Sequence, residues 1–124
     1  MIRQYLRIIQ IVALLLWLSQ AKSVACGRTA DSLVLVKLNQ STNGNGWITK
    51  WRFNEPINTW YGIALDINGC VIQINLNNNN LKGSLPTEIG NLGALSRLFL
   101  FSNELSGELP TSLGNLTELL ELNV

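Results

Sequence analysis

The chain has 124 residues, of which nine are Lys or Arg and eight are Asp or Glu, and it contains no histidine. A chain of this length forms one domain at most. Without histidine it cannot carry a histidine general base, a Ser-His-Asp triad or a histidine metal site. Its two cysteines, 44 positions apart, do not make a thiolate metal cluster, and its glutamates in the second half fall at positions expected to be solvated. We therefore predict a protein that is not an enzyme and that needs no cofactor or metal.

The first 25 residues predict a secretory signal. Two arginines precede an apolar run at residues 8–18, and small residues suited to a cleavage site follow: Ser23, Val24 and Ala25. A transmembrane anchor is the alternative, but it needs about 20 unbroken apolar residues, and Gln10 interrupts this run. Without the signal the chain has six basic and eight acidic residues, a net charge of −2. This charge argues against nucleic-acid binding, and secretion places the protein outside the cell or on its surface.

The two cysteines allow three interpretations. Cys26 would be the first residue after the signal, and export implies an oxidising compartment in which it can pair with Cys70. A lipidated Cys26, as in a bacterial lipoprotein, would attach the chain to a membrane, although Ser23 stands where an aliphatic residue is usual. Two free thiols are the third interpretation. We favour the disulfide over lipidation.

Residues 31–39 combine five aliphatic side chains with Asp31 near the start and Lys37 near the end, a charge order that suits a short helix. A strand is the alternative, because valines are frequent and the run is too short for periodicity to decide. The Asn-Gly-Asn-Gly sequence at residues 43–46 predicts a turn. Five aromatic residues follow, and we expect them to cover the apolar end of the repeats: Trp47, Trp51, Phe53, Trp60 and Tyr61.

A repeat of 24 residues begins at Leu76. Residues 76–99 and 100–123 are identical at 12 of 24 positions. A fixed period in this range, carried by leucine, asparagine and glycine, is typical of a solenoid, in which successive coils stack. The identical pairs are Leu76/Leu100, Asn79/Asn103, Leu81/Leu105, Gly83/Gly107, Leu85/Leu109, Pro86/Pro110, Thr87/Thr111, Gly90/Gly114, Asn91/Asn115, Leu92/Leu116, Leu95/Leu119 and Leu98/Leu122.

Each coil is predicted to contain a short strand and then a bend. A turn at residues 66–69 leads into the first strand, where apolar and polar residues alternate. Asn79 and Asn103 follow the strands, and we expect their amides to bond backbone groups left free at the bend, forming a ladder. Pro86 and Pro110 predict the start of a turn or helical coil on the convex side. The apolar pairs expected to share the inner side of the sheet are Ile74/Leu76, Leu98/Leu100 and Leu122/Val124.

The stretches LNNNNLKGSLPTEIGNLGAL and LFSNELSGELPTSLGNLTEL resemble the leucine-rich repeat superfamily, in its 24-residue plant-type class. The runs TNGNGW and TWYGIALDINGCV resemble the N-terminal cap that precedes such repeats in secreted proteins and receptor ectodomains. The resemblance implies an α/β solenoid with short parallel strands on a concave face, 3-10 or irregular turns on a convex face, and a helix-containing aromatic cap.

This resemblance also divides the chain. Residues 1–25 would be the signal, 26–70 the cap and 71–124 the repeats, with two full repeats and the strand of a third, at which the sequence stops. We expect a partial product of a longer protein. Leu65 stands where plant caps usually have a cysteine, which favours a bacterial or protist surface protein over a plant receptor.

Binding should use the outward side of the sheet, because the alternate positions belong to the core. Phe99 and Phe101 beside Arg97 resemble the anchors of protein interfaces, although the same residues would also suit contact with a neighbouring domain. We predict a secreted or cell-surface recognition module for a protein, peptide or glycan. Alternatives are a structural spacer and an ectodomain fragment of a receptor kinase attached to the membrane further downstream. The candidate binding residues are Gln73, Asn75, Asn77, Arg97, Phe99, Phe101, Glu121 and Asn123.

Two asparagines begin Asn-X-Ser/Thr sequons and are candidates for glycosylation if the source is eukaryotic. They are Asn39 and Asn115. Because Asn115 belongs to the repeat consensus, its match to the sequon can be incidental.

Overall fold

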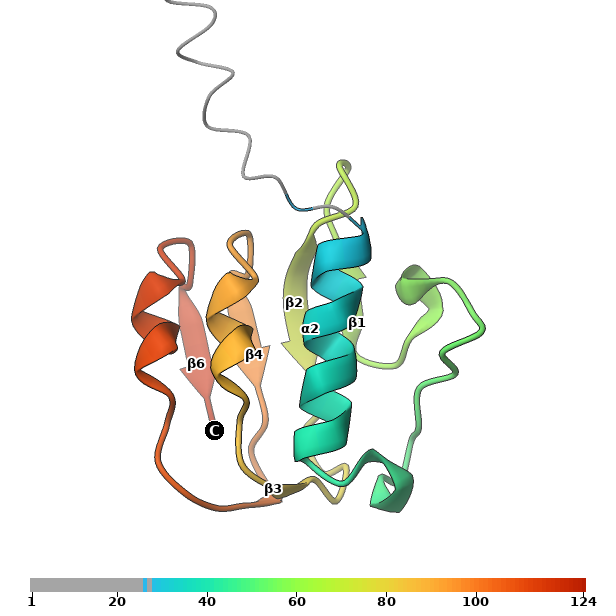
Figure 1. Cartoon of the computed structure of the whole chain (residues 1–124), viewed down its shortest axis with the longest axis vertical. Helices are drawn as coiled ribbons and strands as arrows, with labels where there is room; N and C mark the ends of the chain where they lie inside the picture. Colours follow the sequence, from blue (N-terminus) through green and yellow to red (C-terminus); the bar gives the residue numbers. More distant parts are fainter. Residues whose placement is uncertain (1–25, 27) are drawn as a thin grey trace, which may run out of the picture.

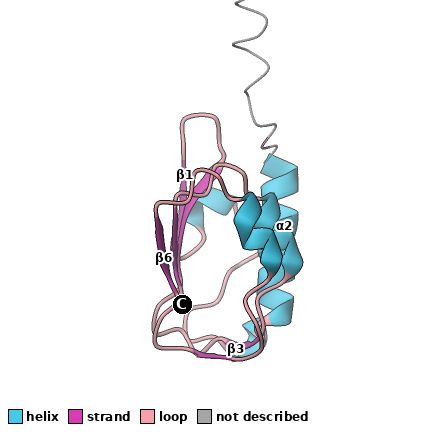
Figure 2. Cartoon of the chain, turned by 90° about the vertical axis from the view of Figure 1, so that its left-hand side faces the viewer, coloured by secondary structure: helices cyan, strands magenta, loops and turns pink. Residues whose placement is uncertain are grey.

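The fold has a sheet on one side and helical turns on the other. The computed structural model describes Cys26 and residues 28–124, so the predicted signal at residues 1–25 lies outside the described residues. In the side view of Figure 2, strands line one face, helices line the opposite face, and loops connect the two layers. Figure 1 shows the successive coils lying side by side.

Residues 31–39, for which a helix and a strand were both open, lie within a helix. Helix α2 spans Arg28–Ser41 and is therefore longer than predicted. Its buried side chains recur at intervals of three and four residues, which is the spacing of a single helix face. They are Asp31, Val34, Leu35 and Leu38. Because Leu33 and Val36 are also aliphatic, this period is hidden in the sequence.

Four strands form the main sheet in the order β1-β2-β4-β6. The last three are parallel, with Gln73 opposite Arg97 and Arg97 opposite Glu121. Equivalent positions of successive repeats thus lie directly beside each other, because both repeats have the same length. This confirms the prediction of a solenoid-like fold with parallel strands. The strands are β1 (Ile63–Leu65), β2 (Val71–Asn75), β4 (Arg97–Phe99) and β6 (Glu121–Asn123).

Strand β1 is an addition that the sequence pattern did not predict. It pairs antiparallel with β2, placing Ile63 opposite Ile74. The predicted turn at residues 66–69 connects the two strands as a hairpin, in which Oδ1 of Asp66 accepts the backbone N–H of Asn68 at 2.8 Å and of Cys70 at 2.9 Å. A strand of three residues shows little alternation of its own, so pairing with β2 decides its conformation.

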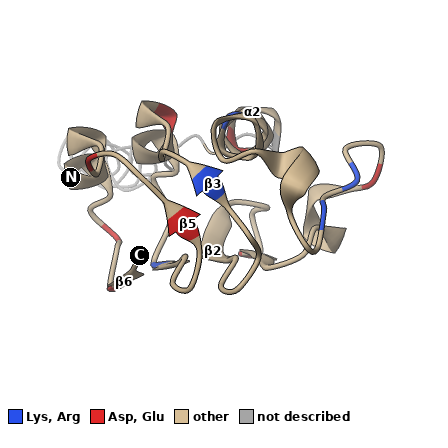
Figure 3. Ribbon diagram, turned by 90° about the horizontal axis from the view of Figure 1, so that it is seen from below, with Lys and Arg blue, Asp and Glu red and all other residues tan. Residues whose placement is uncertain are grey.

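Short helical turns form the opposite side of each repeat. Pro86 and Pro110 immediately precede the 3-10 helices η3 (Thr87–Asn91) and η4 (Thr111–Asn115), as the prolines predicted. Proline suits this place because its φ is already fixed near the helical value and its missing N–H has no partner to lose. Between strand and helix, β3 (Lys82–Gly83) and β5 (Glu104–Leu105) form a second, two-stranded parallel sheet. Figure 3 shows these two strands side by side from below, β3 in blue and β5 in red. Lys82 of β3 and Glu104 of β5 form an ion pair of 3.0 Å.

The core runs continuously between the two layers. The inward residues in and just after β2, β4 and η3 are almost fully buried: Ile74, Leu76, Leu98, Leu100, Ile89, Leu92 and Leu95. The third coil differs, since Leu122 is 44% and Val124 is 48% exposed. Burial therefore fades toward β6, where the described chain packs no further coil against these side chains.

Three tryptophans of residues 47–60 extend the core on the N-terminal side of the repeats. Trp47 meets Trp51 edge to face at 4.8 Å between ring centroids, and Trp51 stacks on Trp60 at 5.2 Å. Each indole N–H donates to a backbone carbonyl, of Thr42, Tyr61 and Glu55 respectively. Phe53 and Tyr61, also expected in this cluster, are about half exposed.

Candidate binding surface

Two asparagine side chains hold successive bends together. Oδ1 of Asn103 accepts the backbone N–H groups of Asn79 and Leu81, both at 3.0 Å. Its Nδ2 donates to the carbonyls of Leu76 at 2.8 Å and Leu100 at 2.7 Å. Asn79 makes the equivalent pair with the backbone of Thr49, accepting its N–H at 2.7 Å and donating to its carbonyl at 3.1 Å. The amides thus link three neighbouring segments through groups that a bend leaves without strand partners.

The eight candidate residues lie at corresponding positions along the sheet. Gln73, Arg97 and Glu121 form one row across the parallel strands. Asn75, Phe99 and Asn123 form the next row in the same register. Because Ile74 and Leu98 between these rows are buried and side chains alternate along a strand, both rows project away from the core.

A third row follows at the ends of the strands, where Asn77 lies beside Phe101. Oδ1 of Asn77 accepts the backbone N–H of Phe101 at 2.9 Å. Phe101 is 40% exposed, and Phe99 is half-buried. Asn77 therefore positions the backbone of Phe101, and its oxygen is occupied in doing so, whereas the sequence suggested only a direct contact with a ligand.

Strand β1 widens this surface, because it forms the edge of the sheet beside β2. Ala64 lies opposite Gln73, and the backbone N–H of Asn75 donates to the carbonyl of Gly62 at 2.7 Å. Gly62 has φ +76°, and a Cβ there would lie about 2.0 Å from the carbonyl oxygen of Asn75. Only glycine fits this close approach of two backbones. Gly62 and Ala64 are not included in the binding surface expected from the sequence, because the sequence pattern does not predict strand β1.

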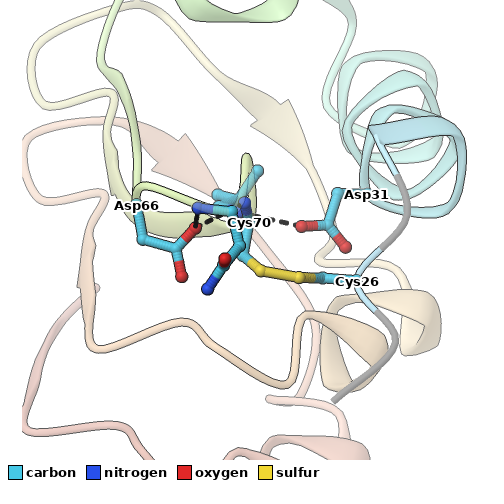
Figure 4. The surroundings of a disulfide bond; sticks show 6 residues. Cys26, Asp31, Asp66 and Cys70 are labelled. Atoms are coloured by element: carbon cyan, nitrogen blue, oxygen red, sulfur yellow. Dashed lines mark hydrogen bonds between the residues drawn. A yellow bond between two sulfur atoms is a disulfide. The ribbon is translucent and has the colours of Figure 1, made fainter. Parts of the chain in front are cut away.

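The N-terminal end of β2 is attached to helix α2 by two links. Cys26, which precedes the helix, and Cys70 form a disulfide, the pairing favoured in the sequence analysis. The buried carboxylate of Asp31 accepts the backbone N–H of Val71 at 2.8 Å. Figure 4 shows Asp31 and Asp66 on the two sides of Cys70. The link from Asp31 was not foreseen, because its partner lies 40 residues away along the chain.

Burial raises the pKa of the Asp31 carboxyl above its ordinary value of 3.8. The hydrogen bond from Val71 opposes this rise by stabilising the carboxylate, and the negative charge of Asp66 adds to it. The ionised form of Asp31 is thus less favourable in the folded chain than in water.

The two sequons differ in their surroundings. Asn115 is exposed at the end of η4. Asn39 lies within helix α2, and its amide fills the space that a side chain at position 44 would take, since a Cβ on Gly44 would lie about 1.9 Å from Nδ2 of Asn39. An attached glycan would have to displace the Asn39 amide from this contact.

Comparison with known proteins agrees with this architecture. The family model of the Leucine Rich Repeat matches residues 70–92 and 94–116. A probable leucine-rich repeat receptor-like protein kinase of Arabidopsis thaliana is 45% identical over 60 residues, covering 45% of this chain and 6% of the kinase. Residues 70–92 and 94–116 of this chain are leucine-rich repeats. These repeats are of the plant-type class.

Solved leucine-rich repeat structures share the fold. The BIR2 ectodomain from Arabidopsis thaliana superimposes with a TM-score of 0.64 at 28% identity, covering 73% of this chain and 52% of that one. The PEPR1–AtPEP1 complex gives 0.62 at 32% identity, with 73% and 13% covered. A leucine-rich repeat protein from Bacteroides eggerthii gives 0.52 at 29% identity, with 56% and 12% covered. The chain thus spans between 6 and 52% of the length of these relatives.

No helix among residues 28–124 is long and apolar enough to cross a membrane. Within the same part of the chain, no three acidic or cysteine side chains gather as metal ligands would.

Proposed function

We propose that this leucine-rich repeat chain is a recognition module of the cell surface or the extracellular space, and that its sheet face binds a protein or peptide. The observation that carries the proposal is the succession of Arg97, Phe99 and Phe101 at alternate positions in and just after strand β4, on the side away from the buried Leu98 and Leu100. Aromatic and arginine side chains supply most of the binding energy in protein interfaces, particularly when polar residues surround them. Here the neighbours of Phe99 in its row are Asn75 and Asn123.

The surface suits recognition because it is fixed before a ligand arrives. The asparagine ladder and the parallel register leave the strands little freedom to rearrange, and a surface that is already ordered loses less entropy on binding. Relatives are consistent with this function, since PEPR1 is seen in complex with AtPEP1.

Area limits the affinity of this chain alone. Four strands at a spacing of about 4.8 Å, with about four residues each at 3.3 Å, present on the order of 250 Å². A stable complex buries about 800 Å² on each partner. We therefore expect weak binding by these coils, with affinity increasing where further coils extend the same face.

The test compares the native chain with one double variant and one single variant in a screen against a library of secreted proteins and extracellular peptides. Phe99→Ala with Phe101→Ala should lose the captured partners while keeping the circular dichroism and melting behaviour of the native chain. Leu33→Ala is the matched control, because Leu33 is 67% exposed on helix α2, away from the sheet. Partners that bind the double variant as well as the native chain would refute the proposed face. A glycan array tested with the same variants decides whether sugars use it.

We also infer that residues 1–25 direct secretion and that residues 26–70 act as the N-terminal cap of the repeats 71–124. The disulfide supports export, because such bonds persist in oxidising compartments. The buried tryptophans support a cap, because they continue the core beyond the first repeat. Expression in a secreting host should give a mature protein that begins at Cys26 with a blocked thiol. A lipid mass on Cys26 would overturn the disulfide, and retention of residues 1–25 would overturn the signal.

A spacer function is the competing proposal. In that case the coils only separate other domains, and substitutions on the sheet face leave every interaction of the full-length protein unchanged. The match to a receptor-like kinase favours an ectodomain function over a spacer, and a non-catalytic function for these residues in either case.

A further inference from the structure

A cavity of about 660 Å³ lies apart from the sheet face, between helix α2, the segment of residues 53–60 and the β1–β2 hairpin. None of the eight residues of the sheet face lines it. Its volume falls within the range of pockets that hold small ligands or single side chains of a partner. The residues that decide its chemistry are Val36, Phe53, Glu55, Trp60, Asp66 and Ile67.

The wall of the cavity is aromatic and aliphatic. Phe53 meets Trp60 edge to face at 5.2 Å between ring centroids. The indole N–H of Trp60 donates to the carbonyl of Glu55 at 3.0 Å, which fixes this ring against the segment. Phe53 is 52% exposed, and Ile67 at the tip of the hairpin is fully exposed. Phe53 and Ile67 therefore present apolar surface at the mouth of the cavity, where the apolar part of a ligand can contact them.

Charge determines which ligand fits. The charged side chains that line the cavity are Glu55 and Asp66, and both are acidic. Asp66 is fixed in place, because its Oδ1 accepts two backbone N–H groups of the hairpin turn. Its Oδ2 has no hydrogen-bond donor within residues 28–124. An oxygen held in position at the edge of an aromatic wall is a ready acceptor for a cationic donor.

Glu55 contributes less than Asp66 to the negative charge of the cavity. It also borders a neighbouring hollow that is lined by Lys50 and Arg52. The positive side chains reduce the field of Glu55, so Asp66 is the principal anionic group of the cavity.

We propose that this cavity binds an organic cation with an apolar body, namely an alkylguanidinium or alkylammonium group. The cation pairs with Oδ2 of Asp66, and the alkyl part contacts Phe53 and Ile67. The same group is offered by a free amine or by an arginine or lysine side chain of a partner protein, so the experiment includes both sources.

The probes are N-acetylarginine amide and its neutral isostere N-acetylcitrulline amide, titrated at low salt while the indole N–H of Trp60 is followed by NMR. The arginine probe should give saturable shifts, and the citrulline probe should bind at least tenfold more weakly. Asp66→Asn should weaken the arginine probe about tenfold, because the amide oxygen still accepts the turn hydrogen bonds while the charge is lost. Phe53→Ala should weaken it severalfold.

Glu118→Gln is the matched control, because it removes an exposed acidic charge that does not line the cavity. It should leave binding unchanged. A basic tripeptide that binds tenfold more tightly than the single amide identifies a partner side chain as the source, and equal affinity identifies a free cation. Equal binding of the arginine and citrulline probes, or undiminished binding to Asp66→Asn, would overturn the proposal. The sheet-face variant with alanine at positions 99 and 101 should bind the probe normally.

Discussion

The asparagine ladder makes a sharp prediction about stability. Replacing Asn103 by alanine removes the acceptor of two backbone N–H groups, those of Asn79 and Leu81, and both of these residues are buried. It also removes the donor to the carbonyls of Leu76 and Leu100. A buried donor without a partner costs about 1–3 kcal/mol.

The position of Asn103 limits the penalty. Asn103 itself is partly exposed, so water can reach some of the groups that its removal would leave free. The two N–H groups contribute about 1 kcal/mol each, at the low end of this range, and the partly hydrated carbonyls contribute about 1 kcal/mol together. We therefore expect Asn103→Ala to lower the free energy of unfolding by about 3 kcal/mol. This is a large part of the 5–15 kcal/mol that stabilises an ordinary domain.

Urea denaturation followed by tryptophan fluorescence measures this loss. With a slope of about 1.5 kcal/mol per molar urea, the midpoint should fall by about 2 M. Asn91→Ala is the matched control, because Asn91 is another asparagine of the repeat consensus but is exposed, and its side chain makes no hydrogen bond within the described chain. It should change the free energy of unfolding by less than about 0.5 kcal/mol. Equal effects of the two substitutions would refute the argument that the ladder stabilises the bends.

Three further predictions follow from the N-terminal links and the sequons. Because the pKa of Asp31 is raised in the folded chain, the native chain loses stability as the pH rises through that pKa and the carboxyl ionises. Asp31→Asn has no such carboxyl, so its free energy of unfolding relative to that of the native chain should increase between about pH 3 and pH 7 in parallel urea titrations. A difference that stays constant with pH would contradict this. Reduction of the disulfide, whose cysteines are 44 residues apart, should lower the free energy of unfolding by about 4 kcal/mol if restriction of the unfolded chain dominates, and a loss below about 1 kcal/mol would count against that cause. In a glycosylating secretory host, Asn115→Gln should remove a glycan mass and Asn39→Gln should not, as judged by mass spectrometry before and after deglycosylation; the reverse pattern would show that Asn39 leaves its contact with Gly44.

The repeated part of the fold was predictable because each coil contacts the next in the same way. Equal repeat length fixes the register of Gln73, Arg97 and Glu121, and the spacing of leucines fixes which side of each strand faces the core. The prolines located the helical turns for a local reason, since proline alone restricts φ there.

Features that depend on distant partners were not predictable in this way. Strand β1 has only three residues, and its pairing with β2 makes it a strand. The charge order of residues 31–39 predicts that Asp31 acts on the helix dipole, but its buried carboxylate accepts the backbone N–H of Val71, 40 positions away. The cavity beside Asp66 draws its walls from three separate segments. Local patterns carry no information on such contacts until the chain is folded.

Amide hydrogen exchange tests most directly that successive coils share one stacked architecture. The backbone N–H of Leu76 donates to the carbonyl of Phe99 at 2.9 Å, from the first coil to the second. We predict that this amide exchanges only through global unfolding, like the amides of the buried face of α2, while the amide of the exposed Glu108 exchanges rapidly. Exchange of the Leu76 amide as fast as that of Glu108, in a chain whose helix α2 stays protected, would contradict the stacking of the coils and the binding face built on it.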